Sequence, residues 1–119
     1  MRPIQIKTSK GVLLADRAWQ ATLWSERARG WLGKPSVKDG EGLLLTPASS
    51  VHSLGMAFEF DLAFLDRDGR VLKTVAPMRR QRLAWGPWWG KGVQALELPA
   101  GSLAKAGVTR GDVLSVEER

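Results

Sequence analysis

Short stretches of alternating apolar and polar residues occupy most of the chain, and this alternation predicts β-strands. The stretch 3–18 alternates on both sides of Lys10-Gly11 and predicts a hairpin. A second hairpin is expected from residues 58–75, where the turn sequence DRDG separates two arms. Shorter apolar runs predict three further strands, at residues 43–46, 93–98 and 111–118.

The first arm of the second hairpin is expected to have two different faces. Its strict alternation would place three aromatic rings and a leucine on one face and point Asp61 to the other. The apolar face would consist of Phe58, Phe60, Leu62 and Phe64.

One stretch has the spacing of a helix. Apolar residues recur at intervals of three and four within residues 17–32, which predicts the principal helix of the fold. Asp16 is a suitable N-cap for it, and Gly33 is a suitable end. One or two further helical turns are expected near the C-terminus, with Ser102 as cap and Gly107 as terminator.

Together these elements predict a mainly β protein of the α+β class. It would be a compact antiparallel sheet or small β-barrel, with the helix 17–32 packed against it and a short C-terminal helical turn. The length of 119 residues fits a single domain that can bury a core of its own. An uncovered edge strand could pair two copies, so we expect a monomer or a weak homodimer.

Composition narrows the possible chemistry. The chain has no cysteine, which excludes disulfides, thiolate metal ligands and a cysteine nucleophile. Its formal net charge of +6 could attract nucleic acid or simply aid solubility. We find no apolar run long enough for a signal peptide, and no stretch near the roughly 18 apolar residues of a membrane span. We therefore expect a cytoplasmic protein.

Three segments in order carry a resemblance to a known family. They are RARGWLGKP, GEGLLLTPASSVHSLGMAFEFDLAFLDRDGRVL and ALELPAGSLAKAGVTRGDVLSV. From about Arg17 to Val116 the chain resembles the DUF192 family of small bacterial and archaeal proteins. The resemblance implies one mainly β domain, which we place at residues 1–119, and it implies no activity, because the family's name records an unknown function.

The chain also departs from the family pattern in three places. Many relatives carry an export signal, which we do not expect in this chain. An aliphatic residue is common in the family where this chain has Trp31, and a proline often stands near Glu59-Phe60. None of these departures removes a polar group from the central motif.

His52 is the only histidine and the first candidate for function. If its segment lies beside the strand that carries Asp61, the carboxylate could orient one imidazole nitrogen and leave the other facing a pocket as a general base. The same contact could instead serve only to satisfy two half-buried polar groups. Both hypotheses stay open. Met56, four residues later, would line the same site.

Other catalytic and metal sites fit the sequence poorly. Ser53 follows His52 directly and would point to the opposite face of an extended chain, and no nucleophile elbow surrounds it. One histidine without cysteine does not make a conventional zinc site. A calcium loop aligned on DRDG would put Phe64 and Val75 at ligand positions. We therefore expect no metal and no cofactor.

The segment 77–92 is the most unusual in composition, because it is rich in Arg, Trp and Gly. Its arginines could contact phosphates and its tryptophans could stack on bases, which would suit single-stranded nucleic acid. Flat rings could equally bind another ligand. Alternatively, the tryptophans fold back over the sheet.

The leading hypothesis is a non-enzymatic accessory domain that binds an unidentified small molecule or protein. One alternative is a small hydrolase or isomerase with His52 as general base, oriented by Asp61. Another is single-stranded nucleic-acid binding by residues 77–92. The expected binding residues are His52, Met56, Asp61, Arg79, Arg80, Trp85 and Trp88.

Overall fold

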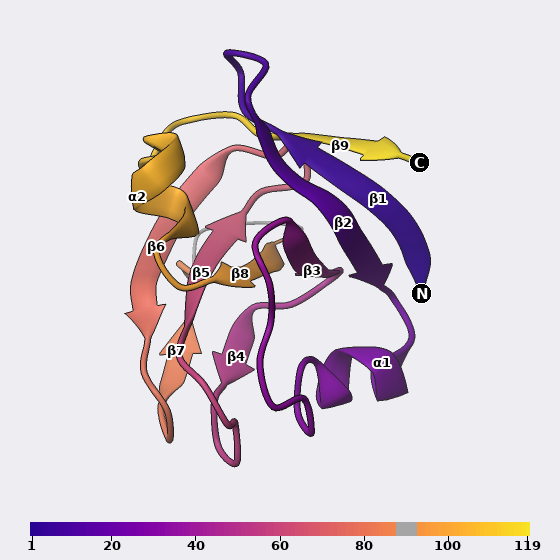
Figure 1. The fold of residues 1–119 in the computed structure, drawn as a ribbon, viewed down its shortest axis with the longest axis vertical. Helices are drawn as coiled ribbons and strands as arrows, with labels where there is room; N and C mark the ends of the chain where they lie inside the picture. Colours follow the sequence, from indigo (N-terminus) through magenta and orange to yellow (C-terminus); the bar gives the residue numbers. More distant parts are fainter. Residues whose placement is uncertain (88–92) are drawn as a thin grey trace.

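The computed structural model describes residues 1–87 and 93–119. Within these ranges, seven strands form a mixed sheet in the order β6-β5-β8-β3-β2-β1-β9, and β4 and β7 form a separate small sheet (Figure 1). The strands of the large sheet are β1 (Arg2–Lys7), β2 (Leu13–Ala21), β3 (Glu41–Leu45), β5 (Phe60–Leu65), β6 (Val71–Met78), β8 (Gln94–Pro99) and β9 (Ser115–Glu118). The small sheet consists of β4 (Ser50–His52) and β7 (Leu83–Trp85), and the helices are α1 (Trp24–Arg29) and α2 (Ser102–Ala106).

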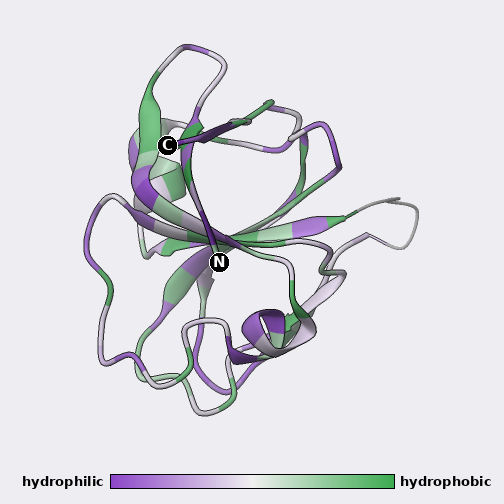
Figure 2. Ribbon diagram, turned by 90° about the vertical axis from the view of Figure 1, so that its right-hand side faces the viewer, coloured by the Kyte–Doolittle hydropathy of each residue, from purple (hydrophilic) through white to green (hydrophobic). Residues whose placement is uncertain are grey.

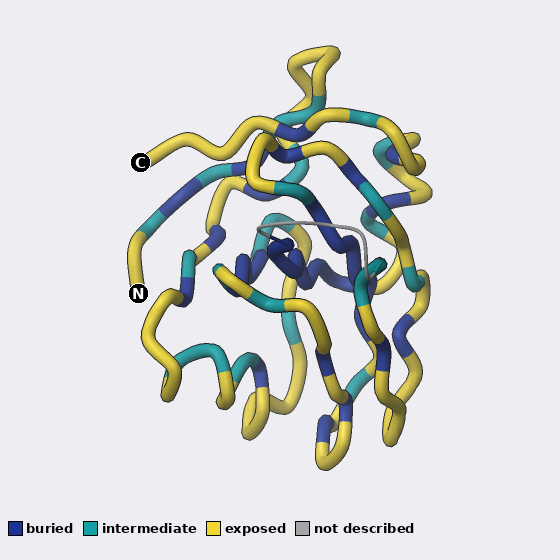
Figure 3. The backbone as a smooth tube through the Cα atoms, turned by 180° about the vertical axis from the view of Figure 1, so that it is seen from behind, coloured by how far each residue is buried: buried dark blue, intermediate teal, exposed yellow. Residues whose placement is uncertain are grey.

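Two apolar cores lie on opposite faces of the large sheet. The α2-side core contains Leu103 of α2, and the α1-side core contains Trp31, just after α1. Figure 2 shows the two helices on opposite sides of the central strands, and Figure 3 shows that the buried positions concentrate in those strands. Along β8, Leu96 and Leu98 join the first core while Ala95 joins the second. β8 is therefore buried on both faces.

The mainly β, α+β class is confirmed, with two differences in architecture. β2 and β3 run parallel, because residues 22–40 form a crossover that includes α1. The large sheet also does not close into a barrel. Its end strands are β6 and β9, and an isolated bridge between Arg70 and Val113 joins the segments that precede them.

The predicted helix 17–32 is wrong over its first half. Residues 13–21 form β2, and α1 is a helix of 6 residues, Trp24–Arg29. The physical reason is tertiary pairing, since β2 lies between β1 and β3 in the sheet and so gains ladder hydrogen bonds on both sides.

A β-bulge and burial on both faces together explain the spacing of the buried residues of β2. Its buried residues Ala15, Ala18 and Ala21 stand three apart. Ala18 pairs with Ile4 and Ala15 pairs with Ile6, so β2 advances by one residue more than β1 over this interval. The extra residue keeps Ala15 and Ala18 on one face, in the α2-side core. Ala21 lies in the α1-side core on the opposite face, as regular alternation places a residue three positions away.

Most other predicted elements are confirmed. β1 pairs antiparallel with β2, and β5 pairs antiparallel with β6. Phe60 and Phe64 lie in the α1-side core and Ala63 lies in the other, as the alternation predicts. The predicted cap of α2 is displaced by one residue, because Gly101 is the N-cap and Ser102 begins the helix. Within the described ranges, neither helix is long and apolar enough to cross a membrane.

Candidate functional site

His52 lies on the exposed face of the small sheet. In the antiparallel pair β4-β7, Ser50 is opposite Trp85 and His52 is opposite Leu83. Directly opposed residues share one face of a sheet, and all four of these residues are exposed. We call this surface the outer face. The alternate residue of each strand packs into the α1-side core.

Buried polar contacts hold the small sheet in place. Ser53 is fully buried, and its Oγ donates to the carbonyl oxygen of Arg79 and accepts the backbone N–H of Arg82 at 2.9 Å. The Nε of Arg80 donates to the carbonyl oxygen of Met56 at 2.9 Å. These contacts join the turn after β4 to the segment between β6 and β7.

A groove of about 260 Å³ lies beside His52, between β4 and α1. We call it the α1–β4 groove. Its charged or ionisable side chains are those of Arg27, Arg29 and His52, and none of the described residues in its lining is acidic. The lining residues are Trp24, Arg27, Ala28, Arg29, Gly30, Trp31, Leu45, Ser50, Val51, His52 and Met56.

Two residues of the groove are held firmly. Arg27 donates from Nε to the carbonyl oxygen of Thr22 and from a terminal nitrogen to that of Pro47, each at 3.1 Å. Trp31 is buried, and its ring centroid lies 5.9 Å from that of Phe58 and 6.2 Å from that of Phe60. The latter pair meets edge to face, a favourable geometry for aromatic rings.

Asp61 does not share this groove. It is buried on β5, where its Oδ2 accepts the backbone N–H of Leu103 at 2.9 Å. The carboxylate thus satisfies an amide in the first turn of α2. Asp61 faces the α2 side of the large sheet, whereas Val51, beside His52, packs into the α1-side core. The structure therefore does not bring Asp61 and His52 together.

The remaining predicted residues have different positions. Met56 lines the groove, and Trp85 lies on the outer face. Arg79 and Arg80 lie outside the groove lining and support the turn after β4. Trp88 lies outside the described residues.

Sequence reasoning missed Glu97, which is the most unusual polar residue of the structure. It is 2% exposed on β8, and within the described part of the chain its Oε2 has no hydrogen-bond partner. Its neighbours across the sheet are Leu43 of β3 and Leu62 of β5, both in the α1-side core. Burial in this apolar setting raises the pKa of the Glu97 carboxyl from 4.5 to about 8. Near pH 7 the carboxyl is therefore mostly protonated and neutral.

Gly30 lies directly against this carboxyl. A Cβ atom at Gly30 would stand 3.6 Å from Oε1 and 3.7 Å from Oε2 of Glu97. Gly30 lines the α1–β4 groove and also a second hollow of about 410 Å³, which reaches Trp19 and Leu43. Its φ of +50° is one that favours glycine. The backbone at Gly30, which carries no side chain, thus covers the buried acid.

The alternation in VQALEL was the signal that could have identified Glu97. Val93, Ala95 and Glu97 share one face of the strand, and the other face carries two leucines. If such a strand lies in the middle of a covered sheet, its glutamate has no solvent-facing side. The strand order decides this, and it depends on tertiary pairing.

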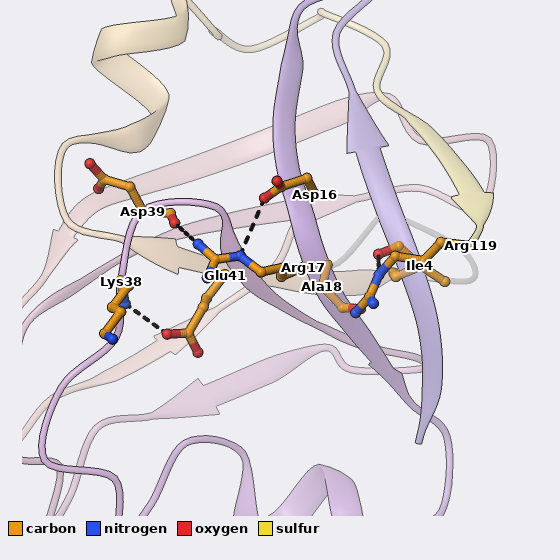
Figure 4. Close-up of polar contacts among 8 residues, drawn as sticks. All are labelled: Ile4, Asp16, Arg17, Ala18, Lys38, Asp39, Glu41 and Arg119. Carbon is orange, nitrogen blue, oxygen red and sulfur yellow. Dashed lines mark hydrogen bonds and ion pairs between the residues drawn. The ribbon is translucent and has the colours of Figure 1, made fainter.

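A larger hollow lies elsewhere and is less distinctive. It measures about 640 Å³ and lies between the start of β2 and α2. Figure 4 shows that two of its charged side chains, those of Asp16 and Arg17, make structural contacts. The guanidinium of Arg17 donates to the carbonyl oxygen of Asp39, and its Nε lies 3.6 Å from Oδ1 of Asp16. In the same view, Arg119 donates to the carbonyl oxygens of Ile4 and Ala18, each at 2.7 Å.

Metal-binding chemistry finds no support in the described ranges, because no three His, Asp or Glu side chains cluster there as ligands. The α1–β4 groove, with the buried acid behind its wall, is therefore the best candidate site of the described structure. It can bind through two arginines, an imidazole and aromatic rings.

Two solved structures have the same fold. One is a protein of unknown function from Novosphingobium aromaticivorans DSM 12444, with a TM-score of 0.78, 22% identity, and coverage of 95% of this chain and 83% of that chain. The other is described as a "putative transcription regulator" from Sinorhizobium meliloti 1021, with a TM-score of 0.80, 20% identity, and coverage of 97% and 92%. At these identities the likeness shows the fold alone. No curated protein matches the chain.

The family comparison covers nearly the whole chain. Residues 5–116 match DUF192, whose description is "Uncharacterized ACR". The match begins within β1 and ends within β9, and it includes the groove and Glu97. The chain therefore belongs to the DUF192 family.

Proposed function

We propose that the chain is a binding domain whose ligand occupies the α1–β4 groove and carries a negative charge on an apolar or aromatic body. The groove lining supports this most directly, because Arg27, Arg29 and His52 are basic and no described lining residue is acidic. Arginine forms strong, charge-assisted hydrogen bonds with carboxylate and phosphate. Trp24 and Trp31 add flat apolar surface for the rest of the ligand.

The size of the groove limits the ligand. Pockets for drug-sized ligands usually measure about 300–1,000 Å³, and this groove measures about 260 Å³. We therefore propose a compact anion, such as an aromatic acid, or the acidic end of a longer molecule.

We propose binding rather than acid–base catalysis because of the position of Asp61. Its carboxylate accepts the amide of Leu103 and is not placed to orient His52. In the proposed site, His52 is a contact for the ligand and Met56 is part of the apolar wall.

The test is an NMR titration with three matched probes: benzoate, benzyl alcohol and benzylamine. We expect benzoate to shift the signals of His52 and of the Trp24 and Trp31 indoles, with much weaker effects from the neutral and cationic probes. Arg29→Gln should weaken benzoate binding up to about fivefold, since exposed ion pairs contribute at most about 1 kcal/mol.

Arg67→Gln is the matched control, because Arg67 is also exposed but lines a different hollow. Equal binding of all three probes, or equal loss in both arginine variants, would contradict an anion site in the groove.

A second candidate function is binding of single-stranded nucleic acid across the outer face. Two exposed tryptophans favour it, since Trp85 is 59% exposed and Trp24 is 76% exposed, with Arg27 and Arg29 close to the latter. Aromatic rings beside arginines suit stacked bases and phosphates. The description of the Sinorhizobium meliloti neighbour as a "putative transcription regulator" is compatible with this candidate.

Fluorescence anisotropy with a labelled twelve-nucleotide oligothymidylate tests this candidate. Affinity should fall about tenfold or more between 50 and 200 mM salt if about three phosphates are contacted. Trp85→Ala should weaken binding at least about fivefold through lost stacking. Absence of binding at 50 mM salt would reject the candidate and leave the small-anion proposal standing.

A further inference from the structure

The carboxyl of Glu97 lies behind the wall of the α1–β4 groove. The wall consists of Gly30 and Trp31, and Gly30 is the residue that would contact the carboxyl through a Cβ atom. A buried acid without a partner is costly to ionise. On the side of the wall, its neighbour is loop backbone, which can move more easily than the paired strands. The charge state of Glu97 should therefore act on the groove.

Among the described residues, no cation forms an ion pair with Glu97. The charged or titratable groups on the surrounding elements belong to α1, β2, β3, β4, β5 and the segment before β3. They are Glu26, Arg27 and Arg29 of α1, Lys34 before β3, Glu41 on β3, Asp16 and Arg17 on β2, Asp61 on β5 and His52 on β4. Several are already paired, since Glu26 bonds the N-terminal amine at 2.8 Å and Lys34 bonds Glu41 at 3.0 Å. Within the described ranges, none of them forms an ion pair with Glu97.

We propose that Glu97 is a proton-controlled support for the wall of the α1–β4 groove. With its proton, the carboxyl lets Gly30 and Trp31 close over the α1-side core. Without its proton, the carboxylate draws in water or a cation and displaces them. The consequence for ligand binding rests on the proposed function, whereas the movement of the wall can be measured without any ligand.

The wall, rather than the sheet, is the part that should move. Glu97 is fixed on β8 by ladders to β3 and β5 on both sides. Residues 30–40 contain no helix or strand, and turn bonds such as Leu32 N–H to Arg29 O (2.9 Å) and Lys34 N–H to Trp31 O (3.1 Å) hold the wall. Segments with few such bonds open before central strands do.

Opening would change the groove in two ways. It would remove Gly30 and Trp31 from the lining, and it would let the adjacent Arg29 turn toward the carboxylate as a counter-charge. With a midpoint near pH 8, the protonated fraction of Glu97 falls from about 0.9 at pH 7 to about 0.1 at pH 9. Apparent affinity of the groove for benzoate should therefore fall about tenfold over this interval.

The experiment follows ¹³C signals from pH 5.5 to 9.5 in the protein without ligand. The Glu97 carboxyl and the methyl groups of Leu43 and Met56 should share one transition near pH 8. Glu97→Gln should abolish the methyl transition. Glu59→Gln is the matched control, since Glu59 is an exposed glutamate one residue before β5, and it should leave the transition in place, as should His52→Gln.

The possible results separate the two proposals. Methyl transitions that persist in Glu97→Gln, or a Glu97 carboxyl that titrates below pH 6, would overturn the proton-controlled wall. The carboxyl titration is measured in the unmodified protein, so it decides the matter even if Glu97→Gln does not fold. If the wall moves but benzoate does not bind at pH 7, the ligand proposal alone fails.

Discussion

Two carboxyl groups are buried in the large sheet, and their surroundings differ. Asp61 accepts the backbone N–H of Leu103, so this carboxyl has a hydrogen-bond partner. Glu97 lies among leucines and has an oxygen without a partner, so it retains its proton. The same type of group therefore serves as a structural acceptor on one face and as a titratable site on the other.

The pH dependence of stability tests the environment of Glu97. Its pKa is about 8 in the folded protein and about 4.5 in the unfolded chain, so between these values the folded state holds a proton that the unfolded state has released. The free energy of unfolding should fall as pH rises through this window, by up to about 5 kcal/mol. Urea unfolding at pH 5, 6.5 and 8 should show a much smaller fall in Glu97→Gln. Parallel curves for the two proteins would contradict the assignment.

Removal of the Asp61 carboxylate tests its structural role. Asp61→Ala leaves the buried amide of Leu103 without an acceptor, which should cost about 1–3 kcal/mol of unfolding free energy. Asp61→Asn retains an oxygen and should lose less. Urea unfolding measures both effects. The NMR titration of His52 should be unchanged in Asp61→Asn, and a displaced titration would revive the hypothesis of a His52–Asp61 pair.

At the scale of elements, the short strands β4 and β7 are stabilised by contacts with residues outside the small sheet. β4 and β7 have 3 residues each, too few for a two-stranded sheet that is stable by itself. They are held by apolar residues in the α1-side core and by the buried hydroxyl of Ser53. The outer face, and with it His52, depends on this support.

Ser53→Ala should loosen the small sheet without unfolding the large one. The substitution leaves the buried N–H of Arg82 and carbonyl of Arg79 without the hydroxyl, at a cost of about 1–3 kcal/mol. Hydrogen exchange should accelerate at Val51 and Ala84 more than at Leu96. Ser49→Ala, at an exposed serine, is the control and should change neither. Uniform acceleration across both sheets would show that the small sheet has no separate stability.

At the scale of the whole molecule, one sheet separates two cores. β8 and β5 contribute residues to both, so loss of packing on one face should weaken the other. We therefore expect a single cooperative unfolding transition, as is usual for a domain of this size. The predicted monomer or weak homodimer and the predicted cytoplasmic location stay predictions at this scale.

Truncation of one core tests this coupling. Leu96→Ala in the α2-side core should cost about 2–5 kcal/mol. Trp31 lies in the opposite core, so its indole signal reports that side. The indole signal and far-UV circular dichroism should shift together to lower denaturant concentration. Separate midpoints would show that the two cores unfold independently.

Much of the fold was accessible from the sequence, because strand alternation and turn residues are local signals. The hairpins β1-β2 and β5-β6, the faces of β5, and α2 follow from them. The predicted helix 17–32 was wrong over its first half, because residues 17–21 pair with β1 and β3 in the sheet. The central motif directed attention to His52 and Met56, which line the groove, but it could not place Asp61 on the other side of the sheet.

The sequence by itself determined the class of the fold, the family and the local hairpins, because each depends on neighbouring residues or on a linear motif. Tertiary structure alone decided the strand order, and with it the central position of β8. A strand with alternating residues exposes one face to solvent when only one side of its sheet is covered. It exposes neither face when apolar cores cover both sides. For that reason Glu97 looks like an ordinary polar position in the sequence, and in the folded chain it is a buried acid beneath Gly30.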